Sequence, residues 1–398
     1  MPITENVRTF MLEHAEDDLS RLLLSAARYP GIDVPFAVEQ MAIRRHIHDK
    51  LPTWYANDAL VFPSKLAAEQ CSSEQTARYK QQLMKDARHV CDLTGGLGID
   101  AHSFSSVAEQ VTYIERSKTC YDAAMYNFSV LEVQNITGYN DDAERLAPTF
   151  SDVDVYYIDP SRRNENHARV VALSDCRPDL LVLMPVLLDK APQVIAKLSP
   201  MLDVSHTLAA LPETTEVHVV SVRNECKELL FVTTRNRTET VPVIHCVCFT
   251  ADGREQHFRF TLPEERACTP TFSNDMQTYL YEPDASILKA GAYKQIAVRL
   301  GVNKLHVSSH LYTSDRLVTD FPGRIFRVDD WFPFNGRLCR TIARTIPQAN
   351  IAVRNFPLSV SELRQRTGIA DGGDIYLFAT TMAEGRKVIV RCKKCELQ

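Results

Sequence analysis

The chain has 398 residues, of which 45% are hydrophobic and 24% are charged, as in ordinary globular proteins. A chain of this length is expected to form two or three domains. It contains no apolar run of the ~20 residues that a membrane-spanning helix needs, and its first ten residues lack the pattern of a signal peptide. Eleven cysteines without a regular framework favour reduced thiols, so we expect a cytoplasmic protein with no membrane partner.

The charge is unevenly distributed along the chain. The net charge of −5 argues against a general affinity for nucleic acid, but residues 333–398 contain 11 Lys and Arg against 5 Asp and Glu. A basic module on an acidic body can bind RNA or DNA through its phosphates. A solvated basic surface is the alternative interpretation.

The first two thirds of the chain divide into a helical part and an α/β part. Residues 1–85 predict helices, interrupted at Leu51-Pro52 and Phe62-Pro63. Residues 86–275 alternate apolar strands with helical segments, which is typical of a mostly parallel, doubly wound sheet. We expect its strands at 90–92, 111–114, 135–139, 153–158, 180–183, 195–198 and 217–222, an antiparallel edge strand at 228–233, and a hairpin around Asp252-Gly253.

Two smaller α+β modules follow in the predicted organisation. In residues 276–330 we expect a helix over 285–300 and strands over 304–309 and 324–328. In residues 331–398 we expect helices over 336–346 and 359–366, and strands over 351–355, 375–380 and 387–391. The fold class is therefore α/β, with a Rossmann-like sheet, an N-terminal helical cap and C-terminal α+β modules.

The stretch Asp92-Leu93-Thr94-Gly95-Gly96-Leu97-Gly98 joins a predicted strand to a predicted helix. Such a strand, glycine-rich turn and helix form the first unit of a nucleotide-binding sheet. The carboxylate of Asp92 suits a cationic or hydroxyl-bearing ligand better than a pyrophosphate. S-adenosylmethionine, which carries ammonium and sulfonium groups, fits this requirement.

Acidic residues also follow the next two predicted strands. Glu115 lies 23 residues beyond Asp92, near the spacing at which a dinucleotide site places its ribose-binding acid. Asp142 follows the third strand and could accept a hydrogen bond from an adenine amino group, and Asp141 is nearly as well placed. One such acid would be read as a solvated carboxylate, but three at successive strand ends favour a ligand site.

A second motif, Asp159-Pro160-Ser161-Arg162-Arg163, ends the fourth predicted strand. Asp159 and the Pro160 carbonyl could accept the hydrogens of a base nitrogen and leave its lone pair directed at a methyl donor. Arg162 suits a phosphate or a guanine edge. No cysteine lies in 159–163 for carbon-5 methylation of pyrimidines, and the second proline and aromatic residue typical of adenine methylation are absent, so guanine is slightly favoured. A plain Asp-Pro turn is the alternative.

The C-terminal module carries candidate nucleic-acid contacts. Arg337, Arg340 and Arg344 share one face of a predicted helix, and Arg354 lies nearby in sequence, so these arginines could contact RNA phosphates. By contrast, Cys392 and Cys395 form a pair without a second pair at zinc-site spacing. We therefore predict no metal there, and the twelve histidines show no clustered motif.

These motifs resemble those of class I S-adenosylmethionine-dependent methyltransferases of the bacterial group with a C-terminal THUMP-like domain. The shared stretches, which span nearly the whole chain, are 69–74, 92–98, 159–163, 281–284, 289–291 and 354–358. Thr94 replaces the first glycine of the motif in many methyltransferases. The resemblance implies a ferredoxin-like insertion around 277–325, then the THUMP-like module, and an rRNA or tRNA substrate.

The sequence therefore predicts a cytoplasmic RNA methyltransferase that uses S-adenosylmethionine and needs no obligate protein partner. A catalytically idle RNA-binding protein with the same fold is the alternative, and a nicotinamide oxidoreductase is disfavoured by the glycine spacing. The residues leave open the RNA, the base and the nitrogen. The candidate site residues are Asp92, Thr94, Gly95, Gly96, Gly98, Glu115 and Asp142 for the cofactor, Asp159, Pro160 and Arg162 for catalysis, and Arg337, Arg340, Arg344 and Arg354 for RNA.

Overall fold

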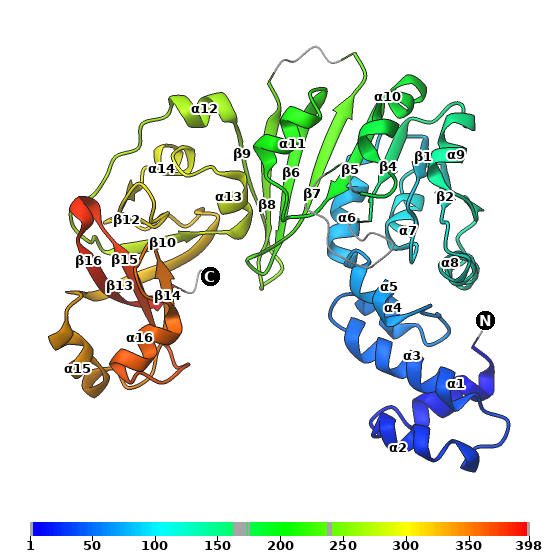
Figure 1. Ribbon diagram of the computed structural model, residues 1–398, viewed down its shortest axis with the longest axis horizontal. Coiled ribbons are helices and arrows are strands. Elements are labelled where there is room, and N and C mark those ends of the chain that lie inside the picture. The colour runs from blue at the N-terminus through cyan, green and yellow to red at the C-terminus, as the bar shows by residue number, and fades with distance from the viewer. Residues whose placement is uncertain (1–2, 162–172, 174–175, 237–240, 396–398) are drawn as a thin grey trace. The chain divides into compact units, whose positions relative to one another are not determined.

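The computed structural model describes every residue except 1–2, 162–172, 174–175, 237–240 and 396–398 (Figure 1). The chain divides into two compact units, Met1–Thr214 with Phe231–Thr238 and Thr215–Leu230 with Glu239–Gln398. Within the described residues, no helix is both long and apolar enough to cross a bilayer. The expected α/β fold class is confirmed.

The N-terminal residues form helices, as predicted. Short polar side chains begin most of them: Asp18 accepts the N–H of Arg21, Asp33 that of Phe36, and Ser73 that of Thr76, which satisfies N–H groups that have no partner inside a helix. The helices are α1 (Glu5–Glu13), α2 (Leu19–Leu24), α3 (Val34–Ile47), α4 (Pro52–Ala56), α5 (Lys65–Gln70) and α6 (Glu74–Leu83).

A mixed sheet follows these helices along the chain. Its strands are β1 (His89–Asp92), β2 (Gln110–Ile114), β3 (Ile136–Tyr139), β4 (Val155–Ile158), β5 (Gln193–Leu198), β6 (Thr214–Val222), β7 (Glu225–Thr234), β8 (Val243–Phe249) and β9 (Glu255–Thr261). The described strands are ordered β3-β2-β1-β4-β5-β7-β6-β8-β9. The order reverses at β1, because β2 and β4 both pair with it in parallel. Ligands of such sheets bind at this switch point, beyond the carboxyl ends of the strands.

The helices between these strands are α7 (Ile99–Ser105), α8 (Lys118–Val130), α9 (Ala143–Leu146), α10 (Leu180–Lys190) and α11 (Val204–Ala210). The prediction of a strand over 180–183 is wrong, because these residues begin α10. Asp179 accepts the N–H groups of Leu181 and Val182 and so starts the helix. Leu180, Leu183 and Leu187 are buried at helical spacing, whereas Val182 is 67% exposed.

A further expectation about this sheet needs correction. The segment predicted as an edge strand, 228–233, lies in β7, between β5 and β6. The hairpin around Asp252-Gly253 forms as predicted from β8 and β9, but it extends the sheet, because β8 pairs in parallel with β6. Such pairings join segments distant in sequence, which local patterns do not record.

The C-terminal residues build a second sheet with one parallel pair, β14 with β15. Its described strands are ordered β11-β12-β10-β13-β16-β15-β14. They are β10 (Tyr279–Pro283), β11 (Asn303–Lys304), β12 (Tyr312–Ser314), β13 (Gly323–Pro333), β14 (Asn350–Arg354), β15 (Ile375–Thr381) and β16 (Lys387–Lys394), with helices α12 (Leu262–Ala267), α13 (Ala285–Ala290), α14 (Gln295–Leu300), α15 (Gly336–Thr345) and α16 (Val360–Thr367).

In this second sheet too, two predicted elements differ from those observed. The helix expected over 285–300 is divided into α13 and α14, because Gly291 adopts a left-handed conformation with φ 81° and ends the first helix. Of the strand expected over 304–309, only Lys304 lies in an observed strand, the two-residue β11. β13 runs across residues 330 and 331, where the sequence suggests a domain boundary, so one sheet serves both predicted modules. The other predicted boundaries stay predictions.

The N-terminal helices pack against the first helices of the sheet through a buried amide. The Asn127 side chain is fully buried on α8. Its Oδ1 accepts the N–H of Val61 and its Nδ2 donates to the Val61 carbonyl, both at 2.8 Å. Nearby, Leu97 and Ile99 belong to the same apolar cluster as Trp54 and Phe62. The helical cap is therefore attached next to the glycine-rich turn.

We predict that Asn127→Ala lowers the free energy of unfolding by about 2–4 kcal/mol, because it leaves the N–H and the carbonyl of Val61 buried without partners. Asn140→Ala, which removes an exposed amide that also donates to backbone carbonyls, should cost less than about 1 kcal/mol. Urea denaturation of both variants measures the difference. Equal losses would mean that the buried amide does not hold the cap.

Candidate active site

The turn between β1 and α7 requires glycine at two positions. Gly96 and Gly98 have φ angles of 53° and 82°, in the left-handed region that side chains disfavour. A Cβ at Gly98 would also lie 2.5 Å from Cζ of Phe128. The chain can therefore follow this path only with glycine at these positions, as the sequence motif predicts.

Glu115 lies against this turn, directly after β2. Its Oε2 accepts the Gly96 N–H at 2.8 Å and its Oε1 accepts the Ser117 N–H at 2.6 Å. The Tyr113 hydroxyl donates to the Gly96 carbonyl at 2.6 Å. The structure thus brings Glu115 and the glycine-rich turn together, and two backbone N–H groups orient the carboxylate.

Asp92 ends β1 beneath the same turn, with 1% of its surface exposed. Its Oδ1 accepts the Thr94 N–H at 3.0 Å. Its Oδ2 is buried and has no hydrogen-bond partner among the described residues. Burial raises the pKa of Asp92 well above its ordinary value, and the charges of Asp100, Asp159 and Glu115 raise it further. A bound cation or hydrogen-bond donor would satisfy this oxygen.

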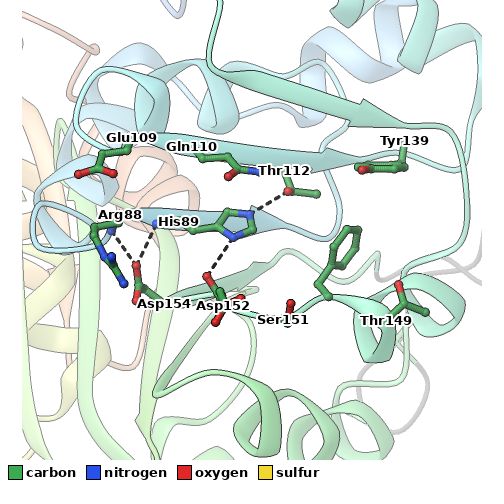
Figure 2. Close-up of a pocket in the computed structure, with 11 residues that line it drawn as sticks. Arg88, His89, Glu109, Gln110, Thr112, Tyr139, Thr149, Ser151, Asp152 and Asp154 are labelled. Atoms are coloured by element: carbon green, nitrogen blue, oxygen red, sulfur yellow. Dashed lines mark hydrogen bonds between the residues drawn. The ribbon is translucent and has the colours of Figure 1, made fainter.

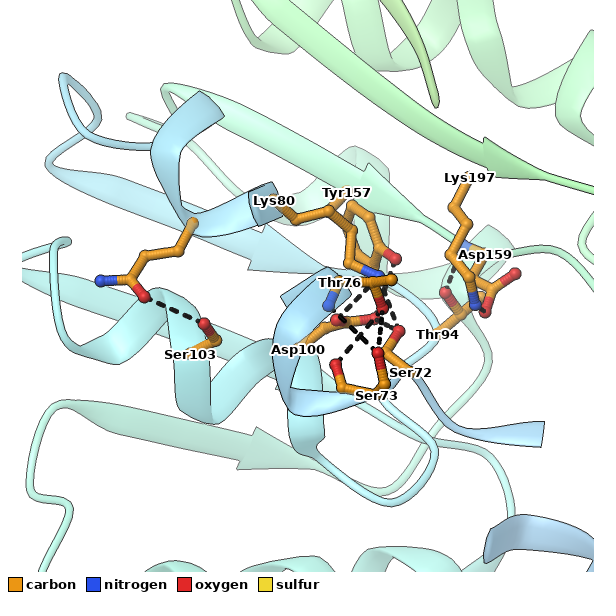
Figure 3. Close-up of polar contacts among 11 residues, drawn as sticks. Ser72, Ser73, Thr76, Lys80, Thr94, Asp100, Ser103, Tyr157, Asp159 and Lys197 are labelled. Carbon is orange, nitrogen blue, oxygen red and sulfur yellow. Dashed lines mark hydrogen bonds and ion pairs between the residues drawn. The ribbon is translucent and has the colours of Figure 1, made fainter. Parts of the chain in front are cut away.

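Thr94 connects the turn to the end of β4. Its Oγ1 accepts the Asp159 N–H at 2.6 Å, a bond that the glycine usual at this position could not provide. The Asp159 carboxylate forms an ion pair with Lys197, near the end of β5 (Figure 3). Pro160 is buried, and Arg162 lies outside the described residues. The carboxylates of Asp92 and Asp159 therefore belong to one edge of the sheet.

A buried polar cluster lies beside this edge (Figure 3). Asp100, in the first turn of α7, accepts hydrogen bonds from Ser72 at 2.7 Å and Tyr157 at 2.9 Å. The fully buried Lys80 approaches its other oxygen at 3.0 Å. Burial alone would raise the pKa of Asp100, but Lys80 and Lys197 hold it below its ordinary value. Asp100 is thus a compensated carboxylate, unlike Asp92.

Sequence reasoning missed this cluster and Lys197. Ser72 lies in the 69–74 stretch, and Lys80 follows on α6. The sequence does contain a signal for Lys197, because it is a basic residue near the end of an apolar strand. Asp159 occupies a similar position directly after β4. Nothing in the local pattern distinguishes Lys80 from a solvated helix residue.

The two acids after β3 differ in their surroundings. Asp142 is exposed at the start of α9, and its side chain makes no capping hydrogen bond. Asp141 forms an ion pair with Arg145. Of these two carboxylates, Asp141 therefore has a basic partner on α9, and Asp142 is exposed to solvent.

A cavity of about 590 Å³ lies elsewhere on this sheet (Figure 2). It includes Arg88, His89 and Asp154, which lie at the amino ends of β1 and β4. The His89 ring contacts Thr112 Oγ1 at 2.9 Å, and Asp154 accepts the N–H groups of Arg88 and His89. These strand ends are opposite to the end that carries the glycine-rich turn, so we do not assign this cavity to the cofactor.

In the C-terminal unit, Arg337, Arg340 and Arg344 are exposed on α15, and Cys339 and Ile342 form its buried face. Arg354 has a different environment. It forms an ion pair with Glu282 at 2.5 Å, and Arg324 binds the same carboxylate through Nε at 2.7 Å. Because Glu282 is 1% exposed, Arg354 compensates a buried charge.

The fold and this edge define a class of protein. A sheet whose strands β3-β2-β1-β4-β5 are parallel, with a glycine-rich turn at its switch point and acids at the ends of β1, β2 and β4, is the arrangement of a Rossmann-like methyltransferase. Two family models match the C-terminal region: a ferredoxin-like domain over residues 279–322 and a THUMP domain-like model over residues 323–394. No curated protein matches the sequence.

A solved structure gives the assignment. The crystal structure of a protein from Porphyromonas gingivalis W83, described as a "putative methyltransferase", is 37% identical, with a TM-score of 0.88 and coverage of 98% of both chains. The chain belongs to the family of this methyltransferase, and the resemblance to methyltransferases with a THUMP-like domain is confirmed. An rRNA methylase from Streptococcus thermophilus matches 41% of this chain and 96% of its own, at 11% identity and a TM-score of 0.31. A similarity this weak supports no inference about function.

We predict that Asp92→Asn raises the melting temperature of the ligand-free protein by a few degrees at pH 8. The folded state raises the pKa of Asp92, so it binds the proton more tightly than the unfolded chain. Stability is therefore lost as the pH rises through the raised pKa, and an amide avoids this loss. The difference should shrink toward pH 5.

Asp142→Asn is the matched control, because this exposed carboxylate should leave the melting temperature unchanged at both pH values. Thermal unfolding from pH 5 to pH 8 measures the effect. A parent protein that is as stable at pH 8 as the Asp92→Asn variant would contradict the uncompensated burial of this carboxylate.

Proposed function

We propose that the protein transfers a methyl group from S-adenosylmethionine to a base nitrogen of structured RNA, either rRNA or tRNA. The observation that carries this proposal is the buried Oδ2 of Asp92 beneath the glycine-rich turn, which has no hydrogen-bond partner among the residues that the structure describes. It lies at a sheet edge shared with Glu115 and Asp159. A methyl donor that carries cationic groups suits this acidic edge, whereas an anionic ligand does not.

Each acid has a role in holding the cofactor. The Asp92 carboxylate would bind the ammonium group of the methionine moiety and lose its excess proton. Glu115 would accept hydrogen bonds from the ribose hydroxyls, and Asp142 one from the adenine amino group. Thr94, Gly95, Gly96 and Gly98 would provide the closely approaching backbone. The bound cofactor supplies the electrophilic methyl group.

The acceptor base would lie against Asp159 and Pro160. The Asp159 carboxylate and the Pro160 carbonyl accept the hydrogens of the nitrogen, which directs its lone pair outward. Lys197 forms an ion pair with Asp159 and presents a donor beside this acceptor, a pairing that suits the polar edges of both purines. Guanine is favoured because the second proline and aromatic residue typical of adenine methylation are absent. Arg162 would bind a phosphate or the guanine edge.

RNA binding would be the task of the C-terminal unit. The THUMP domain-like segment contains α15, whose three exposed arginines form a basic face. Arginine binds phosphates in a bidentate way and suits such a surface. Arg354, engaged by Glu282, would contribute less than the arginines of α15.

We predict that Asp159→Asn lowers kcat by about 10²- to 10⁴-fold, the usual contribution of a positioned proton acceptor. The dissociation constant for S-adenosylmethionine should change less than about threefold, which corresponds to less than about 0.7 kcal/mol of binding free energy. Radiolabelled methyl transfer to rRNA and tRNA from a strain that lacks the gene measures the rate, and calorimetry measures binding. The exposed Asp189→Asn on α10 is the control.

The same assay separates the rival functions. RNA binding without cofactor binding or methyl transfer would favour a catalytically idle RNA-binding protein. Mass spectrometry of the labelled nucleosides identifies the base, and methylated pyrimidine carbon would exclude the proposed acceptor geometry.

We further predict that replacing Arg337, Arg340 and Arg344 with Gln weakens RNA binding and lowers the salt dependence of log K by about one per lost phosphate contact. Filter binding at several salt concentrations measures the slope. Arg21→Gln with Arg28→Gln, two exposed arginines of the N-terminal helices, should leave it unchanged. An unchanged slope in the α15 variant would remove this face from the interface.

A further inference from the structure

A group of metal-ligating side chains lies on the pair of strands β6 and β8, in the second unit of the chain. These strands pair in parallel with His218 opposite His245. Glu216 precedes His218 by two residues on β6, so all three side chains project from one face of the sheet. Among the described residues, they are the group of His, Cys, Asp and Glu whose ligand atoms all lie within 4.8 Å of one another.

The distances within this group suit a small cation. Oε2 of Glu216 lies 3.1 Å from Nε2 of His218 and 3.4 Å from Nε2 of His245. Zinc binds imidazole nitrogen and carboxylate oxygen at about 2.0–2.2 Å, so two ligands of a tetrahedral zinc ion lie roughly 3.3–3.5 Å apart. The 3.4 Å separation therefore falls in the range for neighbouring ligands around one ion, and the 3.1 Å separation lies slightly below it. Small movements of the side chains would place all three ligand atoms around one ion.

The surroundings position the imidazoles. The rings stack with centroids 4.5 Å apart and an interplanar angle of 10°. His218 is 3% exposed, whereas Glu216 and His245 are partly exposed, so an ion can enter from their side. Arg259 lies opposite His245 on β9, but it is exposed, and solvent screens its charge.

We propose that Glu216, His218 and His245 bind a zinc ion that links β6 to β8. One carboxylate and two imidazoles form a ligand set that zinc accepts readily, with water in the fourth position. The hydrogen bond of Glu216 with His218 and its ion-pair contact with His245 then describe the metal-free form. This site is independent of the proposed methyl transfer, since none of its residues has a role there.

The test is a titration of the metal-free, full-length protein with Zn²⁺. Calorimetry should show one site, and Zn²⁺ should raise the melting temperature. His245→Asn and Glu216→Gln should each weaken binding by more than about tenfold, since even the loss of an outer-shell partner costs about 10- to 100-fold. His206→Asn, an exposed histidine of α11, should bind as the parent does.

Glu216→Gln keeps the size and a hydrogen-bonding oxygen of the side chain, so it should fold even if His245→Asn does not. Visible absorption with Co²⁺ in place of Zn²⁺ identifies the ligands. A four-coordinate spectrum without thiolate charge transfer supports the site. Absence of binding, equal binding by all variants, or strong thiolate bands that indicate the cysteines would overturn it.

Discussion

The site depends on how carboxylates are compensated at the carboxyl edge of the first sheet. Burial penalises an ionised carboxylate unless a cation or N–H groups offset the cost. Asp100 has Lys80 with two hydroxyl donors, Asp159 has Lys197, and Glu115 has two backbone N–H groups. Within the described part of the chain, Asp92 has one N–H for its two oxygens. The edge therefore holds one excess carboxylate, which is the feature that a cationic cofactor would satisfy.

The shape of this edge follows from packing as much as from charge. Tyr113 lies fully buried under the turn and binds the Gly96 carbonyl, while Phe128 occupies the space beside Gly98. Thr94 then connects the turn to Asp159. A change on β2 or α8 would consequently move the backbone of the glycine-rich turn, where the proposed cofactor would bind.

Local sequence patterns predicted the parts of the fold that depend on neighbouring residues. The strand, turn and helix around 92–105 and the hairpin at Asp252-Gly253 were predictable because glycine conformation and alternating burial are local. The strand predicted at 180–183 was an error of periodicity, since four apolar residues suit either structure until Asp179 caps the helix. The place of β7 inside the sheet depends on pairing across distant segments, which no local pattern contains.

The same limit explains which site residues were missed. Asp92, Glu115 and Asp159 follow strands, so their common edge could be inferred from topology. Lys80 and Ser72 come from the segment before β1, and only tertiary packing places them on Asp100. Because Lys80 is fully buried, removing its charge would take away the cation that contacts Asp100 directly. α6, the last N-terminal helix, thus contributes a charge that acts on the site, so the N-terminal helices help to build the site itself.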